Sequence, residues 1–189
     1  GRYVPGQRID PAMLAAEFRT SPTPVRFALY RLVGEGLLTD HARNGLYVPL
    51  PTELVLRDLY DWMDRLLSLA CEILPGAPGA AAAREATSAA AAADIPKGTW
   101  QLFDEVARAT GHRNLHKAVE QANDQLAPVR RAKQHLIEDA AAELSDLIAR
   151  WDTGDMVAFD SALHRYHTRR RQLVPRIVAL LNEGKDRLH

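Results

Sequence analysis

Residues 21–34 read SPTPVRFALYRLVG and decide how the first part of the chain folds. Ser21 is a residue type that caps helices, and Pro22 and Pro24 fall in the first turn, where proline is tolerated. Four apolar residues then recur at the spacing of a buried helical stripe: Val25, Leu29, Leu32 and Val33. The sequence therefore predicts a helix whose other face presents Thr23 and Arg26.

The flanking segments extend this pattern on both sides. Upstream, Asp10-Pro11 signals the start of a short helix that ends before Thr20. Downstream, two short apolar runs at 37–39 and 46–48 flank Asn44-Gly45, which is a hairpin signal. Helix, turn, helix and hairpin in this order are typical of a winged helix-turn-helix domain, which we assign to residues 1–50.

The exposed side of this domain carries chemistry suited to duplex DNA. Ser21 and Thr23 can meet phosphate oxygens at a helix start, and Arg26 can contact a phosphate or a guanine edge. Arg43, at the hairpin tip, suits a phosphate or a narrow groove. The predicted DNA-binding residues are Ser21, Thr23, Arg26, Arg43, Asn44 and Gly45. The same pattern also fits solvated residues of a small structural subdomain.

Residues 5–48 closely resemble the GntR family of bacterial transcription regulators. The resemblance rests on PGQRI at 5–9, SPTPVR at 21–26, EGLL at 35–38 and GLYV at 45–48. It implies that Ser21, Thr23 and Arg26 occupy the DNA-contacting places of the recognition helix, and residues 43–45 those of the wing.

Three departures from the family pattern matter. The family usually has an arginine where Pro22 stands, so the usual operator preference does not carry over. Phe27 and Tyr30 occupy places that are often charged, and we expect them to pack on a neighbouring element rather than on DNA. The family's domain also begins with a helix, which we expect to precede Gly1.

The rest of the chain, residues 51–189, predicts an all-α antiparallel helical bundle. Residues 75–98 are rich in Ala, Pro and Gly and predict a weakly packed connection inside it. Thr99 is the expected cap of the helix after that connection. The predicted helices are residues 52–74, 99–111, 114–150 with a kink at Pro128, and 155 onward with a kink at Pro175. The fold class is therefore mostly α, with a winged helix-turn-helix before the bundle.

Behind a GntR-type winged helix, the bundle resembles the family's FCD effector domain. The resemblance rests on Leu102-Phe103, Val106-Ala107, Gly111, Asn114-Leu115, Glu143, Ile148 and Gly154-Asp155. Many such domains bind a divalent metal, but the corresponding ligand places here hold Trp100, Asp104, Leu144 and Tyr166. Indole and isobutyl groups offer no ligand atom, so we predict no metal and no cofactor.

The resemblance further implies an effector cavity, for which we predict Asp104, Arg130, Tyr166 and His167. If Asp104 is buried, we expect it to pair with Arg130 or another cation, because an unpaired buried carboxylate is costly. The two histidine pairs, His112/His116 and His164/His167, lack the further ligands of a zinc signature. The basic run 169–171 is read as a solvated face, with attraction of an anionic effector as the alternative.

Composition bounds the function. The 189 residues contain 24 basic and 24 acidic side chains, so bulk charge gives no argument for nucleic-acid binding. The single cysteine, Cys71, excludes an internal disulfide and is expected to serve in packing. No apolar run is long enough to span a bilayer, and no constellation of nucleophile and base indicates an enzyme.

These observations predict a cytoplasmic, one-component bacterial transcription regulator. We expect a homodimer that binds palindromic double-stranded operator DNA and responds to a small organic effector, with a carboxylate among the candidates. The alternative is a helical protein-interaction module with a degenerate winged helix, which the neutral charge and Pro22 favour.

Overall fold

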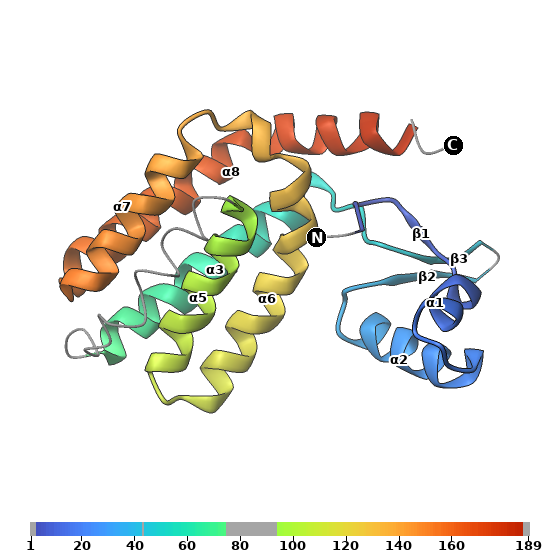
Figure 1. The fold of residues 1–189 in the computed structure, drawn as a ribbon. Coiled ribbons are helices and arrows are strands. Elements are labelled where there is room, and N and C mark those ends of the chain that lie inside the picture. The colour runs from blue at the N-terminus through green and yellow to red at the C-terminus, as the bar shows by residue number, and fades with distance from the viewer. Residues whose placement is uncertain (1–2, 43, 75–93, 187–189) are drawn as a thin grey trace.

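The structure is a computed structural model that describes residues 3–42, 44–74 and 94–186. In chain order its elements are β1 (Arg8–Ile9), α1 (Pro11–Glu17), α2 (Pro22–Gly34), β2 (Thr39–His41), β3 (Gly45–Tyr47), α3 (Glu53–Ile73), α5 (Ile95–Ala109), α6 (Arg113–Ala132), η2 (Gln134–Leu136), α7 (Ala140–Thr153) and α8 (Met156–Asp186). Figure 1 shows the small part with the strands beside a larger, all-helical part.

The first part is a winged helix-turn-helix with its own core. The Asp10 side chain caps α1 by accepting from the Ala12 amide at 2.8 Å. The antiparallel sheet has the order β1-β3-β2, with Arg8 opposite Tyr47 and His41 opposite Gly45. The sequence predicted the hairpin of β2 and β3 but not β1, because a strand of two residues is too short to show a recognisable pattern. The core residues are Ile9, Ala15, Val25, Leu29, Leu38, Leu46 and Val48.

The second part is a helical bundle in which α3 packs mainly against α8 and α5 against α6. Its core is lined by large side chains that are almost fully buried, among them Tyr60, Phe103, Trp151, Phe159 and Ile177. Thr52 caps α3 as predicted, accepting from the Val55 amide at 3.3 Å. Cys71 is buried in this core, and burial raises the pKa of its thiol to about 12.

Two predicted helix boundaries were wrong. The helix after the connection begins at Ile95, not at Thr99, because the Asp94 side chain caps it by accepting from the Lys97 amide at 3.2 Å. Thr99 instead donates its hydroxyl to the Ile95 carbonyl inside the helix, at 2.8 Å. Of the predicted connection, residues 75–93 lie outside the described residues.

The predicted helix over 114–150 is two helices, α6 and α7, separated by the 3₁₀ turn η2. Residues 133–139 contain neither Gly nor Pro, so the usual sequence signal of a helix end is missing there. Pro128 and Pro175 lie inside α6 and α8, which continue past them.

One helix of the bundle contacts the winged domain. Gln121 and Gln125 of α6 each donate a side-chain hydrogen bond of 3.2 Å to the carbonyl of Glu35, just after α2. Gly36 has φ +72, and a Cβ there would lie 2.8 Å from Gln125 Nε2. The backbone conformation therefore favours glycine at 36, and a Cβ there would require the end of the Gln125 side chain to move. In Figure 1, α6 lies on the side of the bundle that faces the winged domain.

An apolar cavity of about 700 Å³ lies between the two parts. Its walls come from both, including Leu29, Leu38, Val55 and Pro128.

Among the described residues, no helix is both long and apolar enough to cross a bilayer.

Candidate nucleic-acid interface and effector site

The start of α2 presents its polar side chains to solvent. Ser21, Thr23 and Arg26 are all exposed, and Ser21 has the extended backbone of an N-cap but makes no side-chain capping bond. Pro22 and Pro24 carry no amide hydrogen, so few backbone donors remain at this helix start. The hydroxyls of Ser21 and Thr23 are therefore the main phosphate donors that this end of the helix offers.

Arg8 joins this surface and was missed by the sequence prediction. Arg8, Arg26 and Tyr30 line one shallow hollow of about 390 Å³ where α2 meets the sheet, together with Asp10, Asp40 and Gly45. A Cβ added to Gly45 would lie 3.5 Å from Arg8 Nε, so the Arg8 guanidinium lies next to the wing backbone. Only the pairing of β1 with β3 brings Arg8 to the wing, and a two-residue strand gives no signal in the sequence.

The wing itself is described in part. Arg43 lies outside the described residues. Asn44 is exposed, and its amide donates to the His41 carbonyl at 2.6 Å in the turn. Gly45 adopts φ +92, a conformation that favours glycine and fits the tight hairpin.

The prediction that Phe27 and Tyr30 pack on a neighbouring element was wrong. Phe27 is 74% exposed and Tyr30 56% exposed. They extend from the same helix as Arg26, one turn apart from each other, because the core stripe of α2 uses the opposite side. The surface therefore combines a cation with two solvent-facing aromatic rings.

The predicted effector residues do not form one group. Asp104 is buried, as expected, but it pairs with Arg108 one turn along α5 and with His116 Nε2 at 2.7 Å. The expected partner Arg130 instead donates from Nη1 to the side chain and carbonyl of Asn123, at 2.7 and 3.2 Å. The expectation that a buried Asp104 pairs with Arg130 or another cation is therefore met by Arg108, and Arg130 is not the partner.

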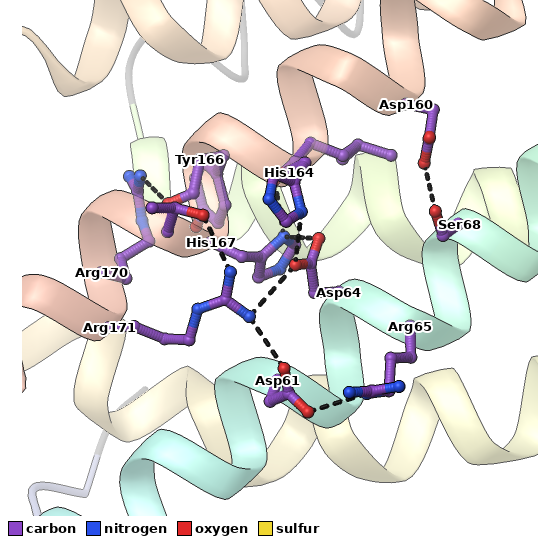
Figure 2. A network of polar contacts seen from close by, with 12 residues as sticks. Asp61, Asp64, Arg65, Ser68, Asp160, His164, Tyr166, His167, Arg170 and Arg171 are labelled. Atoms are coloured by element: carbon purple, nitrogen blue, oxygen red, sulfur yellow. Dashed lines mark hydrogen bonds and ion pairs between the residues drawn. The ribbon is translucent and has the colours of Figure 1, made fainter.

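His167 lies in a separate network between α3 and α8 (Figure 2). Its Nδ1 is 2.8 Å from the Leu163 carbonyl and 3.4 Å from Asp64 Oδ1. Both neighbours are acceptors, so Nδ1 carries the proton. Burial lowers the pKa of His167 even though Asp64 opposes the shift, so the ring is neutral at pH 7.

Asp64 is the centre of that network. His164 and Arg171 approach its carboxylate at 3.0 and 3.2 Å, and Arg171 also reaches Asp61 at 2.9 Å. Burial alone would raise the pKa of Asp64, but the hydrogen bond and nearby positive charge lower it. The network joins α3 to α8, as the dashed lines in Figure 2 show.

The reading of 169–171 as a solvated face was wrong. Arg169 pairs with Asp139, Arg170 with Glu143, and Arg171 with Asp61 and Asp64. Arg170 is only 4% exposed. A run of charges in the sequence did not reveal that its three members pair with acidic residues of α3, of α7 and of the turn before α7.

Arg130 and Tyr166, the other two predicted effector residues, do share a cavity. Its lining also includes Thr99, Lys133 and Arg170. The Arg170 guanidinium carbon lies 3.2 Å from the centre of the Tyr166 ring. Lys133 and Arg170 were missed as site residues, although Lys133 follows Arg130 by three and Arg170 follows Tyr166 by four, spacings that share a helix face. Across the described residues, no three His, Cys, Asp or Glu side chains gather as a metal ligand set.

A winged helix-turn-helix that precedes an all-helical domain defines an architecture of transcription regulators, and this was the predicted fold class. Residues 1–48 match the family model described as bacterial regulatory proteins, gntR family. Residues 1–48 are therefore a GntR-family domain, which confirms the resemblance seen in the sequence.

Individual relatives agree with this assignment. The chain is 44% identical over 59 residues to the Nta operon transcriptional regulator of Aminobacter aminovorans, a match that covers 31% of this chain and 28% of that protein. McbR/YncC of E. coli has a similar structure with a TM-score of 0.72 at 20% identity, covering 93% of this chain and 90% of that one. A putative GntR transcriptional regulator from Rhodococcus sp. RHA1 also gives 0.72, at 16% identity, covering 92% and 89%.

The structural likeness extends over both parts of the chain and confirms the predicted fold. The curated relative is matched over less than a third of its length. The curated relative and the Rhodococcus protein are both described as transcription regulators.

Proposed function

We propose that this protein regulates transcription by placing the start of α2 in a groove of double-stranded operator DNA, with the wing alongside. The observation that carries the proposal is the exposed face formed by Ser21, Thr23 and Arg26 beside Arg8. The bundle contacts the opposite end of α2, through Glu35, and so leaves this face free. Asn44, Gly45 and Arg43 of the wing are the remaining proposed contacts.

We propose further that the protein is a homodimer that reads a palindromic operator, because two-fold protein symmetry matches two half-sites. The support is an apolar stripe on α3. Leu54, Val55, Trp62 and Leu69 are between 44% and 68% exposed, whereas the rest of the apolar face of α3 is in the core. Trp62 and Leu69 are seven residues apart and so lie in one row along the helix; Val55, seven residues before Trp62, also lines the cavity toward the winged domain.

The stripe is complementary to itself when two copies of α3 pack antiparallel. We place the two-fold axis between residues 61 and 62. Each residue of one α3 then lies level with the partner residue for which the two residue numbers add up to 123. Leu54 then faces Leu69 of the partner subunit, and Asp58 faces Arg65 of the partner subunit. One apolar pair and one pair of opposite charges are thus matched, whereas Trp62 lies level with Asp61 of the partner subunit.

The effector is proposed to bind in the helical domain, where Arg130 and Tyr166 share a cavity. The same helix, α6, carries Arg130 at this cavity and Gln121 and Gln125 at the winged domain. A ligand that shifts α6 would change the position of the winged domain relative to the dimer axis, and hence operator affinity. Asp104 and His167 have partners of their own elsewhere and are less suited to contact it.

The test is binding of the purified protein to its own upstream DNA at several salt concentrations. Phosphate contacts should give a steep fall in affinity with salt. Arg26→Ala should weaken binding about 5- to 150-fold, the range for an arginine that contacts a base edge. Arg150→Ala, a surface arginine of α7, is the matched control and should leave binding unchanged. Affinity that ignores both salt and Arg26 would refute the proposal.

The alternative function is protein interaction through a degenerate winged helix. The exposed rings of Phe27 and Tyr30 favour it, because aromatic residues are enriched at protein interfaces. In that case Phe27→Ala would abolish capture of a partner protein, while DNA affinity would be weak and indifferent to Arg26.

A further inference from the structure

Three cationic side chains are buried together in the helical domain. Arg130 of α6, Lys133 just after α6 and Arg170 of α8 are each only 4% exposed, and all three line one cavity. Within the described residues, Glu143 is the carboxylate that ion-pairs with this group, through Arg170. Glu143 offsets one of the three positive charges and leaves two. Burying charge without compensation is costly, so these two remaining charges require an explanation.

Each of the three keeps donor atoms without a partner. These atoms are buried and make no hydrogen bond: Arg130 Nε and Nη2, Lys133 Nζ, and Arg170 Nε. Arg130 Nε and Nη2 are neighbours on one guanidinium edge, the arrangement that binds two oxygens of a carboxylate or phosphate. Native proteins satisfy nearly all buried donors, so four such atoms around one cavity indicate a missing acceptor.

The cavity limits the size of that acceptor. Its volume is about 30 Å³, which is room for roughly two water-sized groups. Two oxygen atoms of an oxyanion fill such a space, whereas a large ring does not. Beyond the three cations, the walls include Thr99, Pro96, Ile137 and Tyr166.

We propose that this cavity binds the oxyanion group of a small anionic ligand, held between Arg130, Lys133 and Arg170. The ligand class is a carboxylate or phosphate whose charge offsets the two cations that Glu143 leaves uncompensated. Because the effector itself is part of the proposed function, the assignment of this anion as the effector rests on that function. The binding of the anion does not.

Aromatic rings explain how the site folds before the anion arrives. Arg130 lies 5.4 Å from the Phe103 ring centre, and Lys133 lies 5.1 Å from that of Tyr60. Arg170 stacks on Tyr166. Cation–π contacts of this kind offset part of the desolvation cost, so the cations are held in place for a ligand.

Anion binding should raise the pKa of Lys133. Burial, followed by the charges of Arg170 and Arg130, lowers the pKa of Lys133 well below its usual value, and Glu143 opposes this only in part. A bound anion favours the charged ammonium and so raises the pKa of Lys133 back toward its usual value. The groups that face it are Tyr60 of α3, Arg130 of α6, Glu143 of α7, and Tyr166, Arg169 and Arg170 of α8.

The experiment measures thermal unfolding of the full chain in sodium phosphate, sodium acetate and sodium chloride at equal ionic strength. Phosphate stabilises folded proteins in general, so the readout is the difference between the native protein and Lys133→Met. Phosphate or acetate should raise the Tm of the native protein by about 3–10 °C more than that of Lys133→Met. Lys117→Met, at an exposed lysine of α6, should respond as the native protein does.

Three further outcomes decide the proposal. Equal responses of the native protein and Lys133→Met to both anions would overturn it. Should Lys133→Met fail to fold, Arg130→Gln serves in its place with the same expectation. Calorimetry over a range of pH, in two buffers of different ionisation enthalpy, should show proton uptake with anion binding that Lys133→Met lacks, and equal uptake in the two proteins would exclude Lys133 as the group whose pKa rises. If the protein binds the anion but not operator DNA, the proposed function is refuted and the proposed anion site is supported.

Discussion

The two parts of the molecule use arginine in opposite ways. In the winged domain, Arg26 is exposed and lies beside hydroxyls and aromatic rings, ready to contact something outside the protein. In the bundle, Arg130 and Arg170 are buried, held over aromatic rings, and directed at a small cavity. Under the two proposals, the same side-chain type would contact a large polyanion at the surface and a small anion inside the bundle.

The difference also sets how each part responds to mutation. Surface charges contribute little to stability, so changes on the winged face should alter binding and leave folding intact. Buried charges are coupled to folding, so changes in the bundle should alter stability as well. The predictions below test this division, from the largest expected effect to the smallest.

Trp62→Asp should break the dimer. It places a charge at the centre of the apolar stripe on α3, and central aromatic residues at interfaces commonly account for at least about 2 kcal/mol. We expect sedimentation to show a monomer at concentrations where the native protein is dimeric, with a correct fold by circular dichroism. Operator affinity should fall with it, because two half-sites are no longer bound together.

A charge exchange sharpens the same prediction. Asp58→Arg and Arg65→Asp should each weaken the dimer, and the double variant should recover much of it. A native protein that is monomeric at micromolar concentration would contradict the proposed interface.

Asp64→Ala should destabilise the bundle by about 1–3 kcal/mol, the cost of leaving buried donors unsatisfied. His167 and Arg171 each lose one of their acceptors, and the contact between α3 and α8 weakens. Urea unfolding measures this, with Glu120→Ala, an exposed acidic residue of α6, as the control. DNA affinity per folded dimer should not change.

The lowered pKa of Asp64 predicts a pH dependence as well. A carboxyl group with a lowered pKa in the folded state binds fewer protons there than in the unfolded chain. The stabilisation from the ionised Asp64 carboxylate is present above the pKa that this group has in the unfolded chain. It is lost as the pH falls through the pKa that Asp64 has in the folded protein. The native protein should therefore lose stability on acidification more steeply than Asp64→Ala, and parallel curves would contradict this.

Gly36→Ala should cost about 1–2 kcal/mol, since alanine is strained at positive φ. A Cβ there also meets Gln125, so the variant should alter the contact between α6 and the winged domain. Gly34→Ala, where a Cβ meets nothing within 4 Å, is the matched control and should be neutral or slightly stabilising. If both variants behave alike, the proposed contact has no energetic role.

Arg8→Ala should have the smallest effect, a loss of operator affinity of about 2- to 5-fold with a reduced salt slope. Such an effect is expected of a phosphate contact, which weakens binding to all sequences alike. Unchanged affinity and slope would place Arg8 outside the interface.

Most of the winged domain could be predicted from the sequence because its signals are local. Asp10-Pro11, the proline-bounded start of α2 and Asn44-Gly45 each specify a backbone conformation within a few residues. The exposure of Phe27 and Tyr30 could not be predicted, because aromatic rings at helical spacing are more often in a core. Nor could the position of Arg8, which depends on pairing with a strand almost forty residues later.

The bundle was predictable as a fold but less so as a site. Helical periodicity indicates that a face is buried but does not identify its partner. Asp104 meets His116 and not Arg130, and this depends on how α5 and α6 pack. The end of α6 at Ala132 has no Gly or Pro to mark it. Lys133 lies just past that end, which is why its burial among cations could not be foreseen.

The central claim is that the start of α2 contacts duplex DNA, and the salt dependence of operator binding tests it most directly. For the native protein, log affinity should fall steeply and linearly with log salt, and Arg26→Ala should lower both affinity and slope. A flat salt dependence, or equal curves for the two proteins, would contradict the account.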